Sequence, residues 1–271
     1  MIWDTGDAAQ PTVVMGIVNV TPDSFSDGGR FERVDAAVQH GLTLAAQGAH
    51  LVDVGGESTR PGAAPVNADE EMARVLPVVR ELAAAGVKVS IDTRNAVTAE
   101  HAVAAGAVVV NDVTGFGDPA MRAVTAAAAV AAVVNHMPTD DPRTMQAHAH
   151  YHDVVAEVRA FFVRRVLECR EAGINDIVVD PGIGFGKTTA HNLELLNQLH
   201  RYADLGCPVL VGVSRKRFIG ELAGDVPPAE RGPGSVAAAL AAVDRGARIV
   251  RVHDVAEHVQ ALRLWHAITR T

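Results

Sequence analysis

Residues 86–112 read GVKVSIDTRNAVTAEHAVAAGAVVVND, and this stretch contains a complete structural unit. An apolar run at 88–91 is followed by a helical pattern, by Gly106 and by a second apolar run at 108–110. Glycine is favoured directly after a helix because helices often end at a residue with positive φ, which costs glycine no Cβ clash. Near-continuous apolar runs are typical of strands covered on both faces. The stretch therefore predicts two parallel strands joined by a helix.

The same pattern recurs along the whole chain. The glycines that follow helical patterns are Gly48, Gly86, Gly106, Gly173, Gly206 and Gly246. The expected strands span 13–18, 50–54, 88–91, 108–110, 130–134, 176–179, 208–211 and 249–252. Helical patterns follow each strand, for example at 36–47, 70–85, 154–172 and 255–269. Alternating strands and helices imply parallel pairing with right-handed crossovers.

Eight such units favour closure into a single (β/α)₈ TIM barrel, and an open doubly wound sheet is the main alternative. The chain has 271 residues, and a barrel of this kind needs about 250. No linker-like stretch divides it, so we expect residues 1–271 to form one domain.

Composition excludes several classes of protein. The net charge of −8 argues against a nucleic-acid partner, which would require a basic surface. The longest apolar run, near 124–134, is too short to cross a bilayer, and the N-terminus does not resemble a signal peptide. Two cysteines, Cys169 and Cys207, provide no disulfide framework. We therefore expect a cytoplasmic protein without a membrane partner.

Polar residues end almost every expected strand. They are Asn19, Asp53, Asp92, Asn111, Asp112, Asn135, His136, Asp180, Arg251 and His253, with Ser214, Arg215 and Lys216 after the seventh strand. A carboxylate or amide inside an apolar barrel costs about a few kcal/mol unless it is paired. Repetition at so many strand ends therefore predicts one polar pocket at the C-terminal mouth of the barrel, where barrel enzymes keep their chemistry.

The expected pocket has two kinds of side chain. Asp92, Asn111 and Asp180 offer acceptors deep in the barrel, which suit a flat heterocycle with adjacent N–H groups. Lys216, Arg251 and His253 offer donors and positive charge, which suit a phosphate or diphosphate. The sequence thus predicts a ligand with a donor-rich head and an anionic tail, gripped by acceptors on the floor and cations near the rim.

Generic motifs do not fit. The segment 180–188 resembles a phosphate-binding loop, but a Walker A motif requires glycine where Pro181 stands. The segment 212–216 lacks the second glycine of a nucleophile elbow, so acyl transfer from Ser214 is not expected. His148, His150 and His152 alternate without an acidic or cysteine partner, which favours a solvated loop over a metal site.

Seven segments match one known family in the right order. They are 16–29, 53–62, 90–93, 111–115, 180–187, 214–216 and 251–254. Through these segments the sequence resembles the dihydropteroate synthases over essentially the whole barrel. The resemblance implies condensation of a dihydropterin methyl diphosphate with p-aminobenzoate, which gives 7,8-dihydropteroate and pyrophosphate in folate biosynthesis. It also implies a sulfonamide target, because sulfonamides mimic aminobenzoate.

The resemblance also implies roles for individual residues. Asp92, Asn111 and Asp180 would hold the pterin ring, and Lys216 would contact its acceptor side. Arg251, His253 and Asn19 would handle the diphosphate, with Asn19 also a ligand of the Mg²⁺ cofactor. The residues expected to frame the aminobenzoate are Thr59, Arg60, Pro61, Phe185, Ser214 and Arg215. A homodimer through the last two helices, at 235–245 and 256–268, is the implied assembly.

Further expectations concern the loops. The segments 21–29 and 55–62 are candidate lids, with Asp23, Phe25 and Asp27 closing over the reaction centre. The chain departs from the family at Phe116, where a small residue is more common, and at 135–138, which lacks an expected glycine. The alternative functions are a pterin-binding methyltransferase domain and a non-catalytic pterin-binding relative.

Overall fold

The structure is a computed structural model that describes residues 2–21, 30–58, 66–139 and 141–269. Eight parallel strands pair in sequence order and close into a barrel, with β8 hydrogen-bonded to β1. The strands are β1 (Val13–Asn19), β2 (Leu51–Gly55), β3 (Val89–Asp92), β4 (Ala107–Asp112), β5 (Ala131–Asn135), β6 (Ile177–Asp180), β7 (Val209–Val211) and β8 (Ala247–Val252). All eight strands expected from the sequence are present, which confirms the (β/α)₈ barrel and excludes the open sheet.

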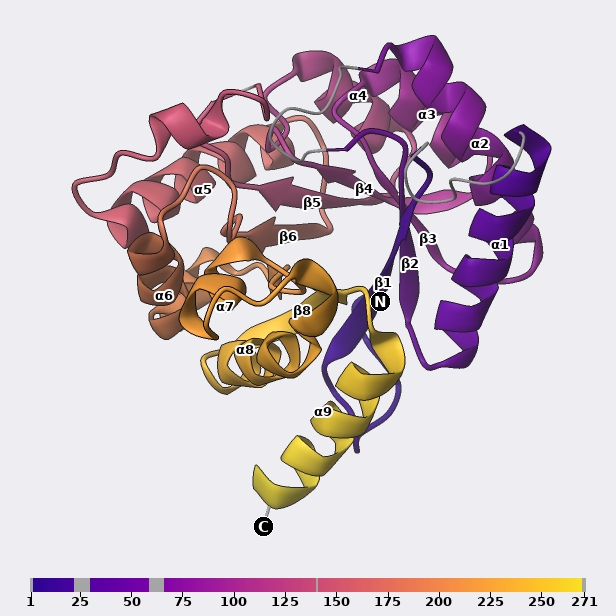
Figure 1. The fold of residues 1–271 in the computed structure, drawn as a ribbon. Coiled ribbons are helices and arrows are strands. Elements are labelled where there is room, and N and C mark those ends of the chain that lie inside the picture. Colours follow the sequence, from indigo (N-terminus) through magenta and orange to yellow (C-terminus); the bar gives the residue numbers. More distant parts are fainter. Residues whose placement is uncertain (1, 22–29, 59–65, 140, 270–271) are drawn as a thin grey trace.

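Helices surround the barrel (Figure 1). They are α1 (Arg30–Ala46), α2 (Ala68–Ala84), α3 (Ala96–Ala104), α4 (Pro119–Ala127), α5 (Val154–Glu171), α6 (Thr189–Asn197), α7 (Arg217–Leu222), α8 (Gly232–Asp244) and α9 (Val255–Thr269). The six glycines expected just after helices have φ angles between 66° and 114°. Each therefore occupies the positive-φ conformation for which glycine was predicted.

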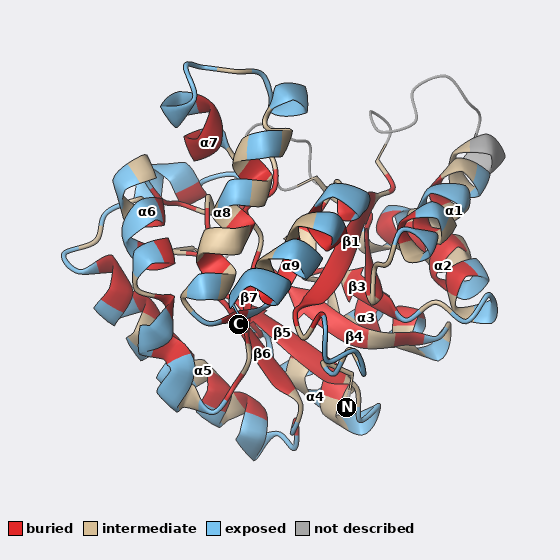
Figure 2. Ribbon diagram, turned by 90° about the horizontal axis from the view of Figure 1, so that it is seen from below, coloured by how far each residue is buried: buried red, intermediate tan, exposed pale blue. Residues whose placement is uncertain are grey.

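Apolar side chains fill two layers. One layer lies between the strands and the helices. In Figure 2 the strands and the helix faces toward them are buried, whereas the outer faces of the helices are exposed. The other layer fills the barrel itself, with Met15, Leu51, Val109, Val178 and Ile249 among its members. Because neighbouring side chains on a strand point to opposite faces, a single apolar strand supplies both layers.

The N-terminal segment covers the end of the barrel opposite the strand carboxyl ends. The side chains of Ile2 and Trp3 pack against the inner apolar layer. The indole nitrogen of Trp3 donates a hydrogen bond to Asp176 Oδ1 at 2.6 Å, just before β6. This end of the barrel is therefore closed by apolar packing, which leaves the opposite mouth for ligands.

Phe116, the first departure from the family pattern, is explained by the core. Its ring is fully buried, although its backbone has a φ of 61°, which a non-glycine residue rarely adopts. Its backbone N–H donates to Asp112 Oδ2 at 2.9 Å. Burial of the ring offsets a strained backbone, where glycine would relieve the strain but leave the space empty.

No described helix combines the length and the apolar character needed to cross a bilayer.

Candidate active site

A polar layer lies directly above the apolar filling of the barrel. On β2, β4, β6 and β8, the residue two positions after an inner apolar residue is polar: Asp53 follows Leu51, Asn111 follows Val109, Asp180 follows Val178 and Arg251 follows Ile249. Side chains two apart on a strand point to the same side. The period of the strands thus aims these four side chains into the barrel at its carboxyl end.

Three of the acidic and amide groups on the floor, Asp53, Asp92 and Asn111, belong to one network around Arg251. Arg251 Nε donates to Asp53 Oδ2 at 2.6 Å, and Arg251 Nη2 donates to Asp92 Oδ2 at 2.6 Å. Asn111 Nδ2 donates to the same Asp53 oxygen at 3.0 Å. Asp53 is fully buried, and Arg251 keeps only 19% of its side chain exposed. The strands β2, β3, β4 and β8 therefore share one hydrogen-bonded network.

The position of Arg251 differs from the sequence expectation. We expected cations at the rim, above an acidic floor, but the guanidinium lies between two floor carboxylates. Burial raises the pKa of Asp92 to about 7, with Arg251 opposing the rise and the Asp53 carboxylate adding to it. Two carboxylates that share one cation in a buried space cannot both be ionised without cost. The net negative charge of Asp53, Asp92 and Arg251 together is therefore smaller than two ionised carboxylates and one guanidinium would give.

Asp180 and Lys216 form the other side of the cavity. Asp180 Oδ1 accepts a hydrogen bond from the backbone of Gly182 at 2.8 Å. Lys216 lies 3.9 Å from the centroid of the Phe185 ring, measured from Nζ. Burial and the nearby Arg251 lower the pKa of Lys216 to about 8, while Asp180 and Asp92 oppose this. The interaction with both aspartates places Lys216 within electrostatic reach of the whole floor.

A glycine keeps the space between these groups open. A Cβ built at Gly212, just after β7, would lie 3.9 Å from Arg251 Cβ and 4.0 Å from Asp180 Oδ2. Any larger side chain on this inner position would occupy the area between the floor and Lys216. The arrangement suits a flat ligand with hydrogen-bonding edges.

Ser214, Arg215 and His253 lie together at the rim. Ser214 Oγ is 3.0 Å from His253 Nδ1, and Arg215 forms a two-pronged ion pair with Asp254. Burial, with Arg251 nearby, lowers the pKa of His253 to about 3, which favours the neutral ring. A neutral imidazole can still offer a hydrogen bond, and its positive charge beside a diphosphate stays a prediction.

The remaining expected residues fall into two groups. Asn19 is the last residue of β1, at the same mouth, and it pairs with Gly55 at the end of β2. Thr59, Arg60 and Pro61 lie outside the described residues, as do Asp23, Phe25 and Asp27. The geometry therefore brings together Asp92, Asn111, Asp180, Lys216 and Arg251, and leaves the two loops without a description.

Two features of the site were missed in the sequence. Asp53 was recognised as a strand end but given no role, although it holds both Arg251 and Asn111. Its place two residues after an inner apolar residue was the available signal. Lys187, in the loop after β6, is buried with 2% exposed. No pattern in the sequence distinguishes it from a solvated lysine.

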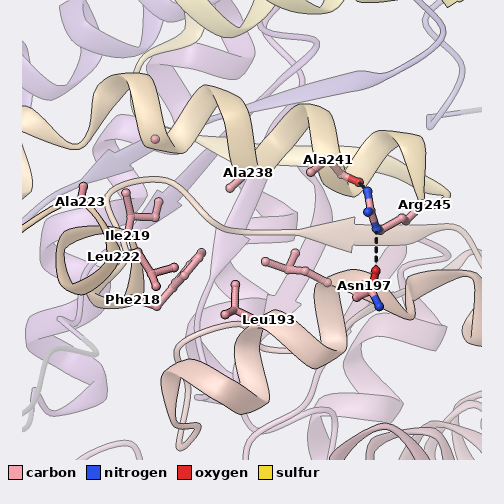
Figure 3. Close-up of a pocket in the computed structure, with 11 residues that line it drawn as sticks. Leu193, Asn197, Phe218, Ile219, Leu222, Ala223, Ala238, Ala241 and Arg245 are labelled. Atoms are coloured by element: carbon pink, nitrogen blue, oxygen red, sulfur yellow. Dashed lines mark hydrogen bonds between the residues drawn. The ribbon is translucent and has the colours of Figure 1, made fainter.

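A second cavity lies away from the barrel mouth. It has a volume of about 450 Å³ and is lined by α6, α7 and α8, with Leu193, Phe218, Ile219 and Ala238 facing it (Figure 3). Arg245 Nε donates to Asn197 Oδ1 at 3.2 Å at one end. Because its walls are apolar, this cavity does not suit a ligand with a hydrogen-bonding head and an anionic tail.

Metal ligands are sparse in the described ranges. Among those residues, no group of three or more His, Cys, Asp or Glu side chains is arranged to hold a metal ion. His148, His150 and His152 are exposed. A metal at the mouth would therefore take most of its ligands from the substrate, from water, or from residues outside these ranges.

Comparison with known proteins agrees with this geometry. Residues 15–253 match the family described as pterin binding enzyme. The dihydropteroate synthase of Neisseria meningitidis serogroup C is 48% identical over 261 residues, covering 94% of this chain and 92% of the relative.

Solved structures give the same result. The dihydropteroate synthase of Xanthomonas albilineans with 4-aminobenzoic acid has a TM-score of 0.90 and 51% identity, covering 96% of this chain and 94% of that one. The Xanthomonas albilineans enzyme in complex with 7,8-dihydropteroate has a TM-score of 0.88 and 47% identity, covering 98% and 96%. The chain therefore belongs to the dihydropteroate synthase family of pterin-binding enzymes.

Proposed function

We propose that the chain condenses (7,8-dihydropterin-6-yl)methyl diphosphate with p-aminobenzoate, giving 7,8-dihydropteroate and pyrophosphate in folate biosynthesis. The observation that supports this most strongly is the polar cluster of Asp92, Asn111, Asp180, Lys216 and Arg251 at the carboxyl ends of the strands. Relatives solved with 4-aminobenzoic acid and with 7,8-dihydropteroate share about half of its sequence. The methyltransferase and non-catalytic alternatives have no comparable support.

The floor is proposed to bind the pterin ring. Carboxylate oxygens of Asp92 and Asp180 accept N–H bonds from the ring, and a carboxylate can accept two parallel bonds. The amide of Asn111 is oriented by Asp53, so it presents a fixed edge to the ring. Lys216 donates to the acceptor side of the ring. Binding of N–H donors favours the ionised form of Asp92, whose pKa is raised by burial.

The cations are proposed to bind the diphosphate. Arg251 is anchored through Nε and Nη2, and its Nη1, which forms no hydrogen bond with the described residues, is left for a diphosphate oxygen. His253 adds a neutral hydrogen bond from the rim. Mg²⁺, when bound, supplies further positive charge to the diphosphate, and Asn19 is the described residue proposed to hold it. One amide oxygen fits, because Mg²⁺ usually completes its shell with substrate phosphates and water.

The chemical step follows from the flow of charge. The bond between the pterin methylene carbon and the diphosphate oxygen breaks, and the amino nitrogen of p-aminobenzoate forms the new C–N bond and loses a proton. The aniline nitrogen is neutral at pH 7, so no strong base is required. We expect catalysis to consist mainly of leaving-group stabilisation by Arg251 and His253, together with positioning.

The aminobenzoate is proposed to lie beside Phe185, Ser214 and Arg215, with Thr59, Arg60 and Pro61 completing its site. The ring of Phe185 lies above Lys216, at the border between the pterin floor and the rim. Ser214 is held by the His253 backbone, whose N–H donates to its Oγ at 3.2 Å. The guanidinium of Arg215 is held by Asp254, which fixes its orientation.

The direct test is release of pyrophosphate that requires both p-aminobenzoate and Mg²⁺. Arg251→Ala should reduce kcat far more than it weakens binding of the pterin ring, because the lost interaction acts on the leaving group. Arg248→Ala is the matched control, since Arg248 lies exposed on the same strand. Equal losses of kcat and pterin affinity in Arg251→Ala would contradict the assignment.

A homodimer and a cytoplasmic location complete the proposal. The apolar cavity between α6, α7 and α8 has exposed leucines on its border, Leu193 at 42% and Leu222 at 61%. Exposed apolar side chains beside a hollow are typical of a protein–protein interface. Helices α8 and α9 were expected at the interface; this cavity is lined by α8 together with α6 and α7, and α9 does not line it. The cytoplasmic location is supported by two free cysteines, Cys169 and Cys207.

A further inference from the structure

Lys187 is a buried lysine in the loop that follows β6. Its ammonium group has three hydrogen-bond partners: His136 Nδ1 at 3.0 Å, the His136 carbonyl at 3.3 Å and the Phe185 carbonyl at 3.0 Å. Only 2% of the residue is exposed. All three partners can accept, provided that His136 Nδ1 is unprotonated, and burial lowers the pKa of His136 well below 6.5. The amine is therefore fully satisfied by two loops of the barrel mouth.

The contacts of Lys187 join two segments that are distant in sequence. His136 follows β5, and its backbone N–H donates to the Asp180 carbonyl at 2.8 Å. Gly182 lies so close to His136 that a Cβ would overlap the His136 carbonyl oxygen, and a Cβ at Gly186 would overlap Pro138. The loop at 181–187 therefore packs against the segment at 136–138, and Lys187 hydrogen-bonds the two segments together.

This loop also forms the wall against which Lys216 lies. The Phe185 ring centroid is 3.9 Å from Lys216 Nζ, and a Cβ at Gly184 would lie 2.9 Å from Lys216 Cδ. Because Lys187 holds the carbonyl of Phe185, it fixes the backbone from which that ring projects. Lys187 thus connects the segment after β5 to the backbone of Phe185, and the Phe185 ring in turn contacts Lys216 beside the proposed pterin site.

We propose that Lys187 is a positioning residue that holds Phe185 against Lys216 and so shapes the aminobenzoate side of the active site. The inference rests on the proposed function. Lys187 does not face the substrates; it acts through the ring that it places. A lysine suits this position because three donors on a long stem can reach both carbonyls and the imidazole at once.

The test compares substrates as well as variants. Lys187→Met keeps most of the stem and removes every donor. We expect it to raise KM for p-aminobenzoate about tenfold, the effect of losing one well-placed aromatic contact from the Phe185 ring, and to leave KM for the pterin diphosphate nearly unchanged. The matched control is Tyr151→Phe, which removes a 3.2 Å bond from the tyrosine hydroxyl to the Gly186 carbonyl of the same loop. That control should leave both KM values nearly unchanged.

A double-mutant cycle with Phe185→Leu separates positioning from general support of the fold. If Lys187 acts through Phe185, Lys187→Met should add little in the Phe185→Leu background, whereas independent effects would multiply. If Lys187→Met does not fold, Lys187→Gln, which keeps N–H donors, replaces it and should give an intermediate KM. Equal rises in both KM values, or independent effects in the cycle, would overturn the proposal. Failure of the wild-type chain to release pyrophosphate would instead refute the proposed function.

Discussion

Replacing Asp53 by asparagine should destabilise the protein more than its modest change in shape suggests. Asp53 is fully buried, and one of its oxygens accepts from both Arg251 and Asn111. Its other oxygen, Oδ1, has no hydrogen-bond partner among the described residues. In the asparagine variant, the side-chain oxygen can still accept from Arg251. The amide nitrogen then occupies the position of Oδ1, where the described residues provide no acceptor for its N–H groups.

The expected magnitude has two parts. Changing a hydrogen bond to a charged group into a neutral one loses about 1–1.5 kcal/mol, and a buried donor without a partner costs about 1–3 kcal/mol. The sum, about 2–4.5 kcal/mol, lies below the upper range of about 5 kcal/mol for breaking a buried ion pair. The loss stays below about 5 kcal/mol because Arg251 retains its ion pair with Asp92.

Guanidinium-induced unfolding followed by circular dichroism measures this effect. The matched control is Asp204→Asn, the same substitution in an ion pair with Arg159 whose side chains are 62% and 37% exposed. Exposed pairs contribute about 0–1 kcal/mol, so the control should be nearly neutral. If the two variants lose the same free energy of unfolding, the buried network does not stabilise the barrel as argued.

Three further outcomes are expected. Lys216 is charged below its pKa of about 8, so affinity for an unreactive pterin analogue should fall by up to about tenfold per pH unit above pH 8. In calorimetric titrations, Lys216→Met should remove this dependence of affinity on pH. Phe116→Gly relieves about 1–2 kcal/mol of backbone strain but loses about 3–5 kcal/mol of core packing, so its Tm should decrease; an increase would show that strain dominates. Leu222→Glu should convert a dimer to a monomer in analytical ultracentrifugation, whereas the same change at Leu167, exposed on α5, should not; the reverse result would move the interface to α5.

The sequence predicts the barrel well because its signal is local and repeated. Each apolar run is bounded by its own glycine and polar terminus, and both depend on only a few neighbouring residues. The alternation along β2, β4, β6 and β8 also predicts which polar side chains enter the cavity, as Asp53 and Asn111 illustrate.

What the sequence does not reveal is distance across the barrel. That Arg251 reaches two carboxylates, on β2 and β3, depends on side-chain length and on which strands become neighbours after closure. Likewise, the neutral state of His253 arises from burial and from nearby cations, neither of which is visible along the chain. Lys187 is hidden for the same reason, since its partners come from two different loops.

The pairing of β1 with β8 has a consequence for how the protein is made. The first strand along the chain stays without one of its neighbours until the last strand arrives, and Met15 then lies opposite Arg251. During synthesis the nascent sheet has two open edges, which are prone to association with other chains. The residue that joins Asp53 to Asp92 is supplied by the final strand. A nascent chain that lacks β8 therefore has neither a sealed barrel nor a complete binding site, and ligand protection against proteolysis should first become detectable once β8 has joined the sheet.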